Sequence, residues 1–88
     1  MGYIVKIKRK IERNLKELPD RVQDLFSQLI EDLREQGPIQ PYWPNYGKLS
    51  ENEYHCHLTY RYVACWRQEQ GSISVEVYYV GSREKAPY

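Results

Sequence analysis

The sequence predicts an α+β fold in which two N-terminal helices pack on one face of a mainly antiparallel, four-stranded sheet. Three observations predict this class: a short β-branched run comes first, apolar residues at helical spacing follow, and three strand-like runs fill the C-terminal half. The order is therefore strand, helix, helix and three strands. A chain of 88 residues has room for one core, so we expect residues 1–88 to form a single domain.

The first half of the chain is predicted to contain a strand at residues 3–7 and two helices. The first helix runs to about Glu17 and has apolar residues at helical spacing: Ile7, Ile11, Leu15 and Leu18. Pro19 interrupts this helix, and Asp20 can cap the next one by accepting hydrogen bonds from free backbone N–H groups. The second helix ends at Gly37-Pro38 and has the clearest apolar stripe: Val22, Leu25, Phe26, Leu29, Ile30 and Leu33.

The second half begins with a loop at residues 39–52 that is rich in proline and aromatic residues. Strands are predicted at residues 54–58, 60–67 and 72–80, and Gly71 favours a hairpin turn between the last two. Because side chains alternate between the faces of a strand, one face of the last strand would carry Ile73, Val75, Val77 and Tyr79. On the middle strand, we assign the bulkier alternate set to the helices: Tyr60, Tyr62, Ala64 and Trp66.

We call the sheet face that the helices leave uncovered the open face. Arg61 alternates with the bulkier set, and His55 and His57 alternate with Cys56 and Leu58, which suit the core. Alternation therefore predicts that Arg61 and both histidines lie on the open face. They would lie near a cationic chain end that carries Arg83, Lys85 and Tyr88.

The charges are unevenly distributed along the chain, although the formal net charge is only +1. Residues 1–16 are predominantly basic, and residues 17–36 are predominantly acidic. A local basic field can attract a polyanion even when the net charge is close to zero. The residues expected to attract an RNA backbone are Lys6, Lys8, Arg9, Lys10, Arg13 and Lys85.

Several classes of protein are disfavoured by the composition. Two cysteines, Cys56 and Cys65, are too few for a disulfide scaffold, and alternation places them on opposite sheet faces. The same alternation prevents His55, Cys56 and His57 from closing on one metal ion, and we expect no cofactor. The chain has no 18-residue apolar stretch and no signal-peptide pattern, so we expect a soluble cytoplasmic protein without a membrane partner.

The predicted open-face residues suit the cleavage of RNA by its own 2′-hydroxyl group. This reaction needs a base for the 2′ proton, an acid for the 5′ leaving oxygen and cations for the crowded phosphorane. Histidine titrates near neutral pH and serves as acid or base, and arginine matches phosphate oxygens with a planar fork. A tyrosine such as Tyr88 can stack on a nucleobase.

At these residues the chain resembles the RelE/ParE toxin superfamily of bacterial and archaeal toxin–antitoxin systems. The likeness spans nearly the whole chain, and its most specific parts are a Tyr-Arg strand and a Gly-x-Arg ending. The element order supports it together with four segments: Lys48-Leu49, Tyr54-His55-Cys56-His57-Leu58, Tyr60-Arg61-Tyr62-Val63 and Val80-Gly81-Ser82-Arg83-Glu84-Lys85.

The resemblance implies a toxin that cuts mRNA in the ribosome as a metal-independent endoribonuclease and is neutralised by a cognate antitoxin protein. Arg61 resembles the strand arginine that stabilises the transition state, and Arg83 resembles the arginine that contacts the scissile phosphate. Tyr88 resembles the tyrosine that stacks on the substrate. His55 and His57 occupy positions at which the best-known member has two lysines, one proposed as the general base. Contact with operator DNA is expected only through the antitoxin complex.

Two alternatives remain open at this point. The first is a ParE-like toxin that inhibits DNA gyrase and performs no nuclease chemistry. The second is a non-catalytic module that only binds an antitoxin. Two histidines on the open face favour the nuclease, because a gyrase inhibitor needs no acid or base.

Overall fold

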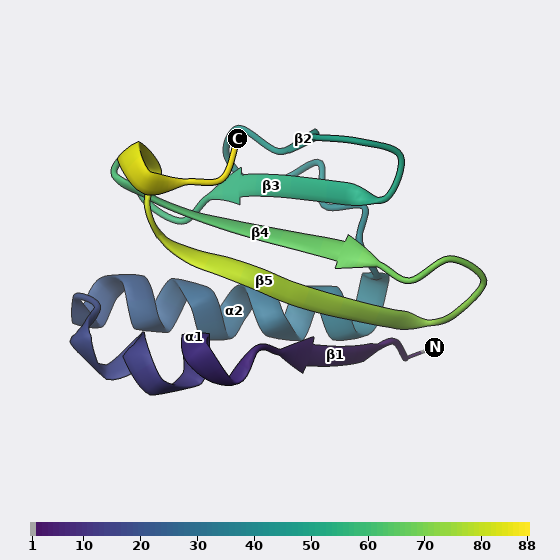
Figure 1. The fold of residues 1–88 in the computed structure, drawn as a ribbon, viewed down its shortest axis with the longest axis horizontal. Helices are drawn as coiled ribbons and strands as arrows, with labels where there is room; N and C mark the ends of the chain where they lie inside the picture. The colour runs from purple at the N-terminus through teal and green to yellow at the C-terminus, as the bar shows by residue number, and fades with distance from the viewer. Residues whose placement is uncertain (1) are drawn as a thin grey trace.

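In a computed structural model that describes residues 2–88, the chain forms two layers, with the helices on one face of a sheet (Figure 1). The first half contains β1 (Ile4–Ile7), α1 (Arg9–Asn14) and α2 (Asp20–Gln36), with a short 3-10 helix, η1 (Leu15–Glu17), between the helices. The predicted α+β class is confirmed. Within residues 2–88, neither helix combines the length and apolarity needed to cross a membrane.

The sheet has five strands rather than the four predicted, in the order β1-β5-β4-β3-β2. The second half of the chain supplies β2 (Gly47–Lys48), β3 (Glu53–His57), β4 (Tyr62–Gln68) and β5 (Ser74–Ser82). Only the β1–β5 pair is parallel; the other pairs are antiparallel. The additional strand, β2, lies inside the predicted loop, and its two residues are too few to show any alternation.

The core lies between α2 and the inner face of the sheet. The predicted stripe of α2 is buried, except that Leu25 is only partly covered, and it packs on Cys56, Leu58, Ala64, Trp66, Val75 and Val77. The loop after α2 completes the cover, because the indole N–H of Trp66 donates to the carbonyl of Pro38 at 3.0 Å. In the same loop, the Trp43 indole N–H donates to Asp32 Oδ2 at 2.8 Å.

Both cysteines are free and buried, and they lie on opposite faces of the sheet as predicted. Cys56 belongs to the core with the helices, whereas Cys65 pairs with His55 of β3 on the open face. Burial raises the pKa of both thiols to about 12. Both therefore remain protonated at neutral pH and are unsuited to nucleophilic chemistry.

The prediction for Tyr60 was wrong, because β4 begins at Tyr62. The Thr59 hydroxyl accepts the backbone N–H groups of Arg61 and Tyr62, each at 3.3 Å, and this contact makes a turn before the strand. Tyr60 is 73% exposed instead of facing the helices. Arg61 is also exposed and lies in the turn instead of in the strand.

The prediction for Tyr79 was also wrong, because β5 contains a β-bulge. Cys65 pairs with Tyr79 but its neighbour Trp66 pairs with Val77, so Tyr78 is an extra residue in the strand. Alternation is reversed beyond this point. Val80 packs against the core in place of Tyr79, which shares the open face with Cys65. Ile73 precedes β5 and is 54% exposed.

Candidate functional site

The ends of β4 and β5 are tied together where the chain leaves the sheet. After β5 the chain forms a second 3-10 helix, η2 (Arg83–Lys85), which is capped by the Ser82 hydroxyl through a hydrogen bond from the Lys85 N–H. The backbone N–H of Arg83 donates to the carbonyl of Arg61 at 2.8 Å. This bond brings together the backbones of two arginines that are far apart in the sequence.

A tyrosine lies along the end of β5 and supports this turn. The Tyr79 hydroxyl donates to the carbonyl of Ser82 at 2.7 Å. The ring lies so close to Gly81 that a Cβ atom there would be 2.9 Å from the hydroxyl oxygen. Any residue other than glycine would therefore push Tyr79 away from the turn that carries Arg83.

Arg83 lies at the junction of two hollows. One, of about 360 Å³, is lined by Arg83 and His57 together with Pro44, Asn45, Leu58, Thr59 and Tyr60. The other, of about 330 Å³, is lined by Arg83 and Arg61 together with Tyr60, Tyr62, Ser82 and Glu84. His57 lines the first hollow, Arg61 lines the second, and Arg83 lines both; we call the two adjoining hollows the Arg83 site.

Tyr60 lines both hollows and contacts Arg83 directly. The guanidinium carbon of Arg83 lies 4.3 Å from the centroid of the Tyr60 ring, and its Nη2 donates to the hydroxyl at 3.3 Å. The sequence-based prediction missed this residue, because it began the strand at Tyr60 and assigned that side chain to the helices. The signal that could have found it is the threonine itself, which commonly begins a turn.

His55 is not part of the Arg83 site. The chain end folds back over the open face, and the ring of Tyr88 covers His55 with 4.6 Å between ring centroids. Gly47 of β2 closes the other side, because a Cβ atom there would lie 3.1 Å from His55 Nε2. The buried Nδ1 has no hydrogen-bond partner among the described residues. Burial, followed by the charge of His57, lowers the pKa of His55 below its ordinary value of 6.5.

Removing the Tyr88 ring with Tyr88→Ala is expected to raise the pKa of His55 towards 6.5, because water then reaches the imidazole. The lowered pKa means that the unfolded chain binds this proton more readily than the folded chain. The wild type therefore loses stability as the pH falls from about 6.5 through the lower, folded-state pKa, and the variant loses less.

An NMR titration of the imidazole protons measures this pKa, and chemical unfolding at pH 5 and pH 7.5 measures the stability change. Tyr42→Ala is the matched control, because Tyr42 is 97% exposed. An unchanged titration midpoint for His55 in Tyr88→Ala would show that the ring does not shield it.

The predicted RNA-binding cations occupy three places. Lys6 of β1 forms an ion pair with Glu69 at 3.3 Å, so its charge is partly neutralised. Lys8 and Lys10 line a groove of about 290 Å³ that also contains Tyr78 and Tyr79. The remaining cations are exposed, on α1 and η2, and have no ion pair among residues 2–88: Arg9, Arg13 and Lys85.

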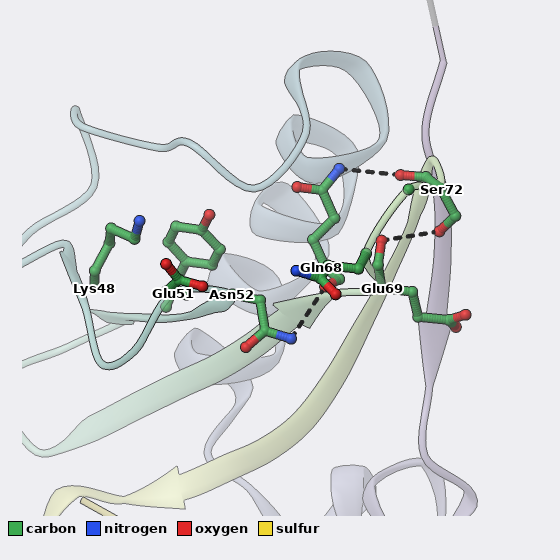
Figure 2. Close-up of a pocket in the computed structure, with 9 residues that line it drawn as sticks. Lys48, Glu51, Asn52, Gln68, Glu69 and Ser72 are labelled. Atoms are coloured by element: carbon green, nitrogen blue, oxygen red, sulfur yellow. Dashed lines mark hydrogen bonds between the residues drawn. The ribbon is translucent and has the colours of Figure 1, made fainter.

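A larger hollow, of about 640 Å³, lies at the opposite end of the sheet beside the β4–β5 hairpin (Figure 2). Its polar groups bond to one another: Asn52 Nδ2 donates to the carbonyl of Gln68, and Gln68 Nε2 donates to that of Ser72. Its charged groups largely offset one another, because Lys48 lies beside Glu51 and Glu69 is paired with Lys6. Within residues 2–88, no group of three His, Cys, Asp or Glu side chains is placed to hold a metal ion.

Comparison with known proteins identifies the fold. No family model and no curated protein matches the chain. A chain of the archaeal RelE–RelB complex from Pyrococcus horikoshii OT3 is 19% identical, with a TM-score of 0.77 over 98% of this chain and 100% of that chain. A mutant of the E. coli toxin RelE in the free state is 16% identical, with a TM-score of 0.74 over 98% of this chain and 88% of that chain. A YoeB/ParE toxin from Agrobacterium tumefaciens is 10% identical, with a TM-score of 0.70 over 91% of this chain and 98% of that chain. The chain therefore has the fold of the RelE/ParE toxins.

Proposed function

We propose that this protein is the toxin of a toxin–antitoxin system, and that it stops translation by cutting mRNA on the ribosome in the cytoplasm. The observation that carries the proposal is the Arg83 site, where Arg83 lies between a hollow lined by His57 and a hollow lined by Arg61. The shared fold supports the toxin assignment, because the matched structures include the E. coli toxin RelE and a YoeB/ParE toxin. The RelE–RelB complex supports a cognate antitoxin as the protein partner.

In the proposed reaction, His57 accepts the proton of a 2′-hydroxyl group, and the oxygen attacks the adjacent phosphorus. The bond from phosphorus to the 5′-oxygen breaks, and a 2′,3′-cyclic phosphate forms. The leaving oxygen takes a proton from a water molecule, and protonated His57 returns its proton to the resulting hydroxide ion. Arg83 and Arg61 donate hydrogen bonds to the non-bridging oxygens as their negative charge grows. The proposed steps use side chains and one water molecule.

Tyr88 and the basic residues are proposed to bind the RNA on either side of the cleaved bond. The Tyr88 ring is 54% exposed, so the face turned away from His55 is available for stacking on a base. Lys8, Lys10 and the exposed cations of α1 and η2 would attract the phosphate backbone. Binding should therefore weaken as salt is added, because released counterions contribute to the affinity.

The decisive test is incubation of the purified protein with ribosomes translating a defined mRNA, followed by primer extension. Cleavage within the translated region is expected. Intact mRNA on ribosomes to which the protein is bound would overturn the nuclease proposal. A gyrase supercoiling assay run in parallel distinguishes the ParE-like alternative from the nuclease, because only a gyrase inhibitor reduces supercoiling while leaving mRNA intact.

A further inference from the structure

Arg83 has an unusual environment for an arginine assigned to phosphate binding. Its guanidinium carbon lies over the Tyr60 ring, 4.3 Å from the centroid. Among residues 2–88 no carboxylate lies within ion-pair distance of it, although Glu84 is its neighbour in sequence. The positive charge is therefore held in place without being neutralised.

Arg67, in the same sheet, is an arginine with a structural role and can be compared with Arg83. It also lies over a tyrosine ring, 4.2 Å from the centroid of Tyr78. Unlike Arg83, it is paired with two carboxylates, Glu53 at 3.8 Å and Glu76 at 3.6 Å. The charge of Arg67 is balanced by its neighbouring carboxylates. Arg83 is held by an aromatic ring and has no carboxylate partner among residues 2–88, so its charge is available to an anion.

The backbone holds both partners of the Tyr60–Arg83 contact. The Thr59 hydroxyl shapes the turn that contains Tyr60, through hydrogen bonds from the next two backbone N–H groups. The Arg83 N–H donates to the carbonyl of Arg61, the residue after Tyr60. These bonds therefore place Tyr60 and Arg83 next to each other in the fold, at a turn where Tyr60 is 73% exposed.

We infer that Tyr60 is a positioning residue, which holds the guanidinium of Arg83 for the scissile phosphate without competing with that phosphate for the charge. The inference rests on the proposed function. A carboxylate in place of the ring would compete with phosphate for the N–H groups, whereas the negative face of an aromatic ring attracts the cation and has no net charge. Only Nη2 is engaged, by one hydrogen bond of 3.3 Å, and the rest of the fork remains free.

Tyr60→Leu removes the ring and the hydroxyl, and Tyr60→Phe removes the hydroxyl alone. We expect Tyr60→Leu to slow single-turnover mRNA cleavage at saturating ribosomes about tenfold, the combined size of an exposed cation–π contact and one hydrogen bond. Tyr60→Phe should stay within about threefold of the wild type. Neither change should alter ribosome affinity, because Arg83 retains its charge. Tyr42→Leu is the matched control for losing an exposed tyrosine.

A double-mutant cycle separates positioning from any general effect on folding. In an Arg83→Ala background, Tyr60→Leu should cause no further loss, since the group that it positions is gone. In the free protein, the Arg83 side-chain protons should show an upfield ring-current shift that persists in Tyr60→Phe and disappears in Tyr60→Leu. The thermal unfolding midpoints show whether each variant is folded.

Three outcomes would overturn the inference. If the wild type and Tyr60→Leu cleave mRNA at the same rate, Tyr60 has no positioning role, and the proposed function is unaffected. Additive losses in the double-mutant cycle, or a Tyr60→Phe variant as slow as Tyr60→Leu, exclude the ring as the support for Arg83. A wild type that leaves mRNA intact overturns the proposed function itself, and the positioning role with it.

Discussion

Replacing His57 with glutamine is expected to slow ribosome-dependent mRNA cleavage by about 10²–10⁴-fold, the usual contribution of a general base. Glutamine keeps a polar side chain of similar length but cannot accept a proton at neutral pH. His57 is the histidine that lines the Arg83 site, so its loss removes the proton acceptor from beside the phosphate. Single-turnover cleavage of a ribosome-bound mRNA measures the rate directly.

His55→Gln is the matched control, because the same substitution is made two residues away on the same strand. His55 is covered by Tyr88 and does not line the Arg83 site, so we expect its variant to cleave within about tenfold of the wild type. If His55→Gln were the slower of the two, the general base would be His55, and Tyr88 would have to move before each reaction.

Arg83→Ala is expected to reduce the cleavage rate by about 10²–10³-fold, as removal of a donor to a developing oxyanion does in other enzymes. Arg83 contributes a charge that no carboxylate balances and a fork whose N–H groups are largely free. Arg83→Lys keeps the charge but loses the planar fork, so an intermediate rate is expected. The same single-turnover assay ranks the three proteins.

The control for net charge is Arg21→Ala, because Arg21 is exposed on α2, on the opposite side of the core from the open face. It removes one positive charge and should leave the cleavage rate unchanged. If Arg83→Ala and Arg21→Ala had equal effects, Arg83 would act only through the net charge of the protein. Cleavage by Arg83→Ala at the wild-type rate would contradict its contact with the phosphate.

Much of the fold could be predicted because its signals are local. The apolar stripe of α2 repeats at helical spacing from Val22 to Leu33, and five of its residues are buried as the pattern indicates. Alternation along β3 and β4 correctly placed Cys56 and Cys65 on opposite faces. In each case the residues of one element are enough to show which face is apolar.

The errors arose where a bulge, a turn or an edge pairing overrides alternation. The bulge at Tyr78 depends on how β5 pairs with β4, and the residues of β5 alone do not predict it. The start of β4 was misplaced because the Thr59 hydroxyl takes two backbone N–H groups from the strand and forms a turn. Strand β2 exists because Gly47 and Lys48 reach the edge of β3, which two residues of sequence cannot show.

By itself, the sequence determined the class of fold and the residues available for chemistry, including two histidines and a cationic chain end. These follow from composition and from periodicities within single elements. Only the tertiary structure decided how the residues divide: His57 and Arg61 join Arg83, whereas His55 lies under Tyr88 and Tyr60 supports the Arg83 guanidinium. The physical reason is that coverage of one side chain by another depends on segments that are distant in the chain, and their packing is set by the whole fold.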